Sequence, residues 1–192
     1  YHEQEIRYIN GKFPVTPENF TPLNSEFNEI NSAPPPSIYG DFNFYYSSDK
    51  NSLGKHFDIL ATHISYNFDQ YNGSFYINAY EPDYYYSFLP QLTKINTKYN
   101  EYGPNFYFTE DKYNFLFWSS DQSGKTQNYC TIHDMTKGID TTEDFGPFPV
   151  NILNSMNSNE GYLTVDSINK SVYFMTDRDG DFNIYRRIFP AS

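Results

Sequence analysis

The chain has 192 residues, a formal net charge of −11 and an unusually aromatic composition, with 20 Tyr, 18 Phe and one Trp. This length suits one domain, and so many large side chains argue against a disordered chain. The 13 Lys and Arg residues form no basic cluster, which argues against nucleic-acid binding. No apolar run approaches the roughly 20 residues of a membrane-spanning helix.

Three segments, in chain order, predict buried β-strands. Each is rich in aromatic or β-branched side chains, which fit a pleated sheet, and each is apolar on both faces. That pattern is typical of a strand sandwiched between two neighbouring sheets. The segments are FNFYYSS (42–48), YNFLFWSS (113–120) and SVYFMT (171–176). Turn residues flank each segment, so we expect every strand to belong to a meander of hairpins with little or no helix.

A polar phrase, which we call the polar knot, precedes each of these strands. The knots are Asn24-Ser25-Glu26-Phe27-Asn28-Glu29, residues 96–101 (NTKYNE), and a looser copy in residues 154–160. Each predicted strand then ends in a hydroxyl residue followed by Asp: Ser48-Asp49, Ser120-Asp121 and Thr176-Asp177. Anchors that recur three times in one order indicate a repeat architecture rather than a single site.

The spacing of the anchors supports this interpretation. The second Asn of the knot precedes the hydroxyl by 20 residues in the first two copies and by 17 in the third. The copies begin 72 and then 58 residues apart. The excess in the first copy lies in residues 62–89, which we interpret as an outer strand plus a long excursion.

The third copy, VYFMTDRDGDFNIYRR (172–187), resembles the TolB-like β-propeller repeat, whose signature is a strand, a Ser-Asp-x-x-Gly turn and an [Asn/Asp]-Ile-Tyr strand. The phrase INTKYNEYGP (95–104) looks like the version found in Bacteroidetes cell-envelope proteins. The resemblance implies an all-β fold, a β-propeller or propeller portion with three TolB-like blades. The expected blades span residues 20–89, 90–147 and 148–192, and residues 1–19 form the end of a preceding blade and a lead-in.

The resemblance also implies a role. Such propellers are often joined to OmpA-type domains or belong to the type IX secretion and gliding apparatus. We therefore expect a non-catalytic scaffold or binding module in the periplasm, the outer membrane or the cell surface. Its partners would be other envelope proteins, or a second copy that closes the propeller. The alternatives are the propeller domain of a larger hydrolase or peptidase, and a glycan-binding module. The sequence contains no G-x-S-x-G nucleophile motif.

Two segments carry candidate binding residues. Tyr84, Tyr85, Tyr86 and Phe88 could form a stacking platform for a sugar or a peptide, because Tyr combines a flat apolar ring with a polar tip. The alternative is an excursion that folds back on its own blade.

Asp177, Asp179, Asp181 and Asn183 form a D-x-D-G-D-x-N pattern close to an oxygen-rich Ca²⁺ loop. The alternative is the hairpin turn of the repeat, which uses Asp and Gly for backbone reasons. We expect no cofactor apart from this possible Ca²⁺.

The single cysteine, Cys130, lies three residues before His133. On a strand, two such positions point to opposite faces, so the pair should not form a catalytic or metal site. We interpret Cys130 as a small buried hydrophobe.

Three units are fewer than the four to eight blades that usually close a propeller. We therefore expect the chain to fold as part of a longer polypeptide or of an assembly. Alone, it should expose an aromatic sheet face at each end, and such faces drive association.

Overall fold

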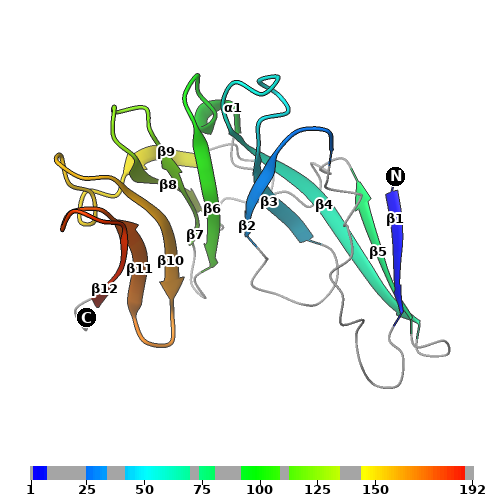
Figure 1. Ribbon diagram of the computed structural model, residues 1–192. Coiled ribbons are helices and arrows are strands. Elements are labelled where there is room, and N and C mark those ends of the chain that lie inside the picture. The colour runs from blue at the N-terminus through cyan, green and yellow to red at the C-terminus, as the bar shows by residue number, and fades with distance from the viewer. Residues whose placement is uncertain are drawn as a thin grey trace.

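In the residues that it describes, the computed structural model is all-β, with twelve strands in three antiparallel sheets and one single-turn helix, α1 (Leu92–Ile95). It describes residues 2–7, 25–33, 42–69, 74–80, 92–108, 113–134 and 144–188. In those residues no helix is long and apolar enough to cross a membrane. Figure 1 shows the sheets following one another across the molecule, with β1 and β12 at opposite ends.

The first sheet has five strands in the order β1-β5-β4-β3-β2. Their bounds are His2–Arg7 (β1), Glu29–Ala33 (β2), Phe42–Ser48 (β3), Asp58–Asp69 (β4) and Ser74–Tyr80 (β5). The strand expected to end an earlier blade lies instead at the outer edge of this sheet, because β1 pairs antiparallel with β5. β5 belongs to the excess residues of the first copy, and β1 covers an edge that would otherwise be open.

The second sheet has the order β6-β7-β8-β9 and the third has the order β10-β11-β12. The bounds are Glu101–Phe108 (β6), Tyr113–Ser120 (β7), Gln127–Asp134 (β8), Asp144–Pro149 (β9), Glu160–Asp166 (β10), Ser171–Thr176 (β11) and Asn183–Ile188 (β12). Each sheet runs outward from the strand that follows its polar knot. The three predicted strands are β3, β7 and β11, with the predicted bounds.

The central sheet is packed on both faces, as its apolar pattern predicts. Leu116 and Trp118 of β7 join Tyr45 and Ile59 of the first sheet in one buried cluster. Phe117, which points the other way, packs against a second cluster that contains Leu153, Leu163, Val172 and Phe174. Burial of one such side chain contributes about 1.5–3 kcal/mol, so these two clusters hold the row of sheets together.

The first strand of each unit carries a β-bulge at the same place, just after the glutamate of the knot. The residue in each bulge has a positive φ: Asn31 (49°), Gly103 (64°) and Tyr162 (55°). A Cβ on Gly103 would also come within 3.0 Å of the Tyr162 ring. The three bulged strands, β2, β6 and β10, lie side by side in Figure 1.

Candidate functional site

A buried glutamate is the centre of each polar knot. In the second knot, Glu101 is fully buried and accepts hydrogen bonds from the backbone N–H (3.0 Å) and hydroxyl (2.7 Å) of Thr97. The Ser120 hydroxyl, at the end of β7, donates a third bond to it (3.0 Å). The knot therefore ties the start of β6 to the end of β7.

An Asn–Asp clamp lies beside this glutamate. The backbone N–H and side-chain amide of Asn100 donate to the two carboxylate oxygens of Asp121 at 3.0 and 2.8 Å. The same clamp joins Asn28 to Asp49 in the first unit and Asn159 to Asp177 in the third. The two bonds from the asparagine lower the pKa of Asp49 and Asp177, because they favour the charged carboxylate. The clamp fixes the asparagine so that its amide oxygen stays available.

The second knot uses that oxygen to bind the first sheet. Asn100 Oδ1 accepts the backbone N–H of Phe57 at 3.1 Å, and the N–H of Glu101 donates to the Phe57 carbonyl at 2.7 Å. Two residues further on, the Asn96 side chain accepts from the Ile59 N–H and donates to the Ile59 carbonyl, both at 2.8 Å. One asparagine side chain thus replaces a strand residue at the edge of β4.

The third knot binds the second sheet in the same way. Asn159 Oδ1 accepts the Thr126 N–H at 3.0 Å, and the Glu160 N–H donates to the Thr126 carbonyl at 2.7 Å. Asn154 accepts the Asn128 N–H at 2.9 Å and donates to its carbonyl at 2.8 Å. We call this four-bond contact between a knot and the preceding sheet the staple.

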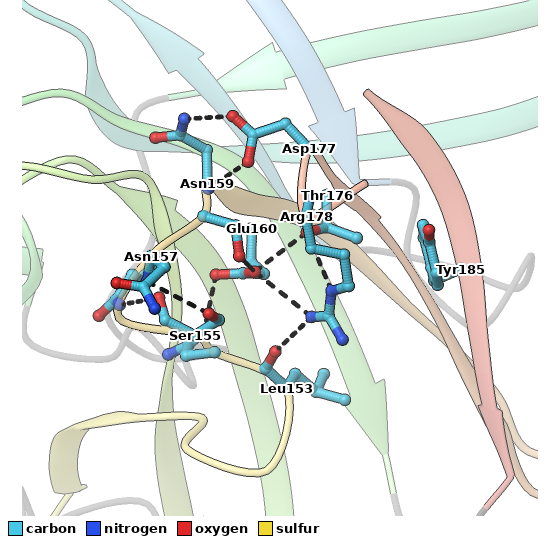
Figure 2. A network of polar contacts seen from close by, with 12 residues as sticks. Leu153, Ser155, Asn157, Asn159, Glu160, Thr176, Asp177, Arg178 and Tyr185 are labelled. Atoms are coloured by element: carbon cyan, nitrogen blue, oxygen red, sulfur yellow. Dashed lines mark hydrogen bonds and ion pairs between the residues drawn. The ribbon is translucent and has the colours of Figure 1, made fainter. Parts of the chain in front are cut away.

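The third knot, which Figure 2 draws, also differs from the second. One additional residue separates its two asparagines, and the two donations that Thr97 makes alone are divided. Ser155 supplies the N–H (3.0 Å), and Ser158 supplies the hydroxyl (2.6 Å). The Arg178 guanidinium donates to Glu160 at 3.3 Å and to the Leu153 carbonyl at 3.0 Å. The buried carboxyl group of Glu160 therefore has a cationic partner.

Glu101 has no ion-pair partner among the described residues. Burial raises its pKa, the Thr97 and Ser120 donors oppose that rise, and the nearby Asp58 carboxylate adds to it. Burial also raises the pKa of Asp58, with His56, 3.7 Å away, opposing the shift. The first staple consequently lies beside two carboxylates that resist ionisation.

The third sheet presents the binding surface of a staple that no described residue fills. Strand register makes Phe182 and Ile184 the counterparts of Phe57 and Ile59, and of Thr126 and Asn128. Ile59 and Asn128 are fully buried, whereas Ile184 is 74% exposed and Phe182 is 56% exposed. β12 is the edge strand of its sheet. The last sheet therefore ends in an open copy of the surface that each internal knot binds.

The predicted Ca²⁺ residues do not converge in this structure. Asp177 is occupied by Asn159, Asp179 accepts a hydrogen bond from the Tyr185 hydroxyl, and Asn183 donates to the Asp181 carbonyl (3.0 Å). In the described part of the chain no three His, Cys, Asp or Glu side chains gather in a way that could hold a metal ion.

The segment instead forms the hairpin turn of the repeat. Gly180 N–H donates to the Asp177 carbonyl at 2.8 Å, as Gly124 does to Asp121 at 2.9 Å. The turn interpretation therefore accounts for Asp177 and Gly180, whereas Asp179 and Asp181 have Ser123 and Lys125 as their counterparts in the equivalent turn.

The other predicted sites have separate outcomes. Tyr84, Tyr85, Tyr86 and Phe88 lie outside the described residues. Cys130 pairs across the ladder with Phe117, and burial raises the pKa of its thiol to about 11. A thiol with that pKa is a poor nucleophile at neutral pH.

Sequence reasoning located the anchors of the knot but not the partners of its asparagines. The first asparagine reaches a backbone 26 to 37 residues away, which leaves no trace in the residue types it meets. Arg178 could have been found from the sequence, because it directly follows the hydroxyl–Asp pair, where the other copies have Gln122 and Lys50.

No protein-family model matches this chain, and no curated protein matches it.

Proposed function

We propose that the chain is a portion of a TolB-like β-propeller that acts as a non-catalytic scaffold for protein–protein contacts in an outer-membrane or periplasmic assembly. The observation that carries the proposal is the staple, which two knots make with the same residue types and with equivalent backbone positions of the preceding sheet. Polar side chains that recur in this chain are used to join one sheet rigidly to the next.

The arrangement of the sheets supports the propeller part of the proposal. A propeller needs meander sheets whose first strands are neighbours and whose faces pack on the sheets before and after. Here β2, β6 and β10 are neighbours, and β7 is buried on both faces.

The use of the polar side chains supports a non-catalytic role. Catalytic groups need an accessible position and a partner that tunes their reactivity. The buried carboxylates Glu101 and Glu160 are surrounded by hydroxyl and backbone donors that hold the fold. Binding surfaces on such a rigid frame are supplied by its exposed faces and edges.

In-cell cross-linking of the full chain, followed by fractionation of its native cells, tests the proposal. We expect the chain in the envelope fraction, cross-linked to one or a few defined proteins. Recovery in the cytoplasmic fraction, or turnover of a substrate by the purified chain, would contradict it.

A further inference from the structure

We propose that the open edge of β12 binds the first polar knot of a second copy, so that copies of this chain associate head to tail. The inference rests on the proposed scaffold role and names one partner and the surface that receives it. It starts from the staple, whose two internal examples define the chemistry on both sides of the contact.

The third sheet, which we call the tail, carries the receiving half of a staple at the edge of β12. In β8, the N–H and carbonyl of Asn128 point away from β7 and bind Asn154. Ile184 occupies the same register position in β12, so its N–H and carbonyl point away from β11 toward the open edge. Unpaired backbone groups at a sheet edge form a ready template for another chain.

The outer face of the third sheet supplies the apolar part of the contact. Ile184 and Ile188, 74% and 62% exposed, lie on that face together with Tyr173 and Met175 of β11. Arg186 lies between the two isoleucines on the same face, and its guanidinium packs over the Tyr173 ring at 5.9 Å from the ring centroid. The counterpart of Tyr173 in the first sheet is Tyr45, which is buried against the second sheet with Ile59. A knot bound at β12 would bring an apolar surface with it and cover these side chains.

The first knot, which we call the head, carries the donating half, of which the structure describes Asn28 and Glu29, while Asn24 lies outside the described residues. Asn28 is clamped to Asp49 through its backbone N–H (3.0 Å) and side-chain amide (2.8 Å), the same geometry as in Asn100 and Asn159. The clamp leaves Asn28 Oδ1 and the N–H of Glu29 as the groups that bind a preceding sheet in the other two units. Asn28 is exposed, whereas Asn100 and Asn159 are half-buried by the sheets that they staple.

A head-to-tail contact joins two different surfaces and leaves one of each free on every dimer. It continues until the rotation closes a ring, or indefinitely as a filament. The first knot leads into β2 of the first sheet and the open edge belongs to β12 of the third, with the second sheet between them in Figure 1, so these two surfaces do not meet each other within the described residues. Association is therefore expected to depend on concentration and to extend beyond a dimer.

Sedimentation velocity of the full chain over a range of concentrations tests the proposal. The tail variant is Ile184→Arg, with Ile168→Arg as its control, because Ile168 is 90% exposed in the β10–β11 turn at the far end of the sheet. The head variant is Asn28→Ala, with the exposed Asn51→Ala as its control. We expect wild type and both controls to associate, and each of the two variants to weaken association at least tenfold.

Mixing the two variants gives the decisive result. Ile184→Arg keeps an intact head and Asn28→Ala an intact tail, so together they should form a one-to-one dimer and nothing larger. A wild-type chain that stays monomeric at every concentration would overturn the proposal, as would a mixture that stays monomeric. Association that survives Asn28→Ala but not Ile184→Arg would indicate a symmetric tail-to-tail contact and would also overturn it. These results concern the purified chain, so they stand or fail separately from its location in the envelope.

Discussion

Between the first and second sheets, Glu101 lies buried without an ion-pair partner among the described residues, and burial raises its pKa. Between the second and third sheets, Glu160 occupies the same place but accepts a hydrogen bond from Arg178. The same hydroxyl cage therefore holds one carboxylate with a cation and one without. The cage positions the glutamate, and among the described residues an ion pair to that glutamate occurs in the third unit, where the cation is Arg178.

The two interfaces also differ at a second position, where the unsatisfied polar group lies in the second interface and not in the first. Ile59 of β4 is a buried apolar residue in the first interface, whereas its counterpart Asn128 is fully buried with both side-chain polar atoms unpaired. The staple tolerates this change because the knot asparagine binds only the backbone of that residue. A contact that is made only to backbone groups can recur between sheets while the side chains around it vary.

Replacement of either glutamate should change the free energy of unfolding more than the other variants do, and the difference between the two losses tests the comparison of the two interfaces directly. Glu160→Ala removes the ion-pair partner of Arg178 and the acceptor of three donors, the Ser155 N–H and the Ser158 and Thr176 hydroxyls. We therefore expect the free energy of unfolding to fall by about 3 kcal/mol. Glu101→Ala should cost about 1 kcal/mol less, because it also removes an uncompensated buried charge. Urea unfolding measures both values, and an equal or larger loss for Glu101→Ala would contradict the difference drawn here.

Repair of the orphaned amide should give the next largest effect. Asn128→Val places a β-branched apolar side chain where the first sheet has Ile59, and we expect the free energy of unfolding to rise by about 1–2 kcal/mol. The staple should persist, since it uses only the backbone of residue 128. Asn151→Val, at an exposed turn position, is the control for changed composition. Destabilisation by Asn128→Val would mean that the amide has a partner in solution.

Transfer of the cation should make the two interfaces alike. Gln122 is the counterpart of Arg178. Arg178 lies over the rings of Phe174 and Tyr185 and donates to the Leu153 carbonyl. The equivalent positions around residue 122 are Trp118, Tyr129 and the Ile95 carbonyl. Gln122→Arg should therefore raise the free energy of unfolding at neutral pH by about 1 kcal/mol. Ser123→Arg adds the same charge at an exposed neighbouring position and should have little effect.

The same variant should change the pH dependence. Because the pKa of Glu101 is raised above its ordinary value of 4.5, the folded state holds this proton more tightly than the unfolded state. That stabilisation is complete below the ordinary pKa and is lost as the pH rises through the raised one. The raised pKa of Asp58 acts with the same sign. Unfolding measured between about pH 4 and about pH 8 should show a shallower fall in Gln122→Arg than in wild type; parallel curves would contradict the assignment.

A matched pair of serines should give the smallest effects. Ser119 accepts the N–H of Tyr162 at 2.9 Å, whereas the hydroxyl of its counterpart Ser47 is buried without a partner. We expect Ser119→Ala to cost about 1 kcal/mol and Ser47→Ala to be nearly neutral in thermal or urea unfolding. Equal losses would show that the two interfaces do not differ at this position.

The strands β3, β7 and β11 were predicted with their bounds because both faces of each are apolar and turn residues flank them. The knots were predicted as repeats, since Asn, Glu and the hydroxyl–Asp pair recur at fixed spacing. The β-bulges were not, because Asn31, Gly103 and Tyr162 share a backbone conformation but no side-chain chemistry.

The pairing of β1 with β5 was also missed. It joins His2 to Ala79, and among the described residues β1 has no counterpart in the other two sheets from which to infer it. Two of the residues in the predicted calcium pattern, Asp177 and Asp179, have hydrogen-bond partners, Asn159 and Tyr185, that the sequence did not reveal. Long-range backbone contacts and turn chemistry are thus where the sequence of this chain is least informative.

Hydrogen exchange read at single residues, at a concentration where the chain is monomeric, tests the staple most directly. The amide hydrogens of Phe57, Ile59, Thr126 and Asn128 are bound by asparagine side chains of the next knot. Those of Phe182 and Ile184 occupy the same register positions, and no described residue binds them. We predict that the first four exchange slowly and the last two exchange fast, although all six lie at the start of the third strand of a sheet. Equal exchange in the three sheets, or fast exchange at Ile59 and Asn128, would contradict the account.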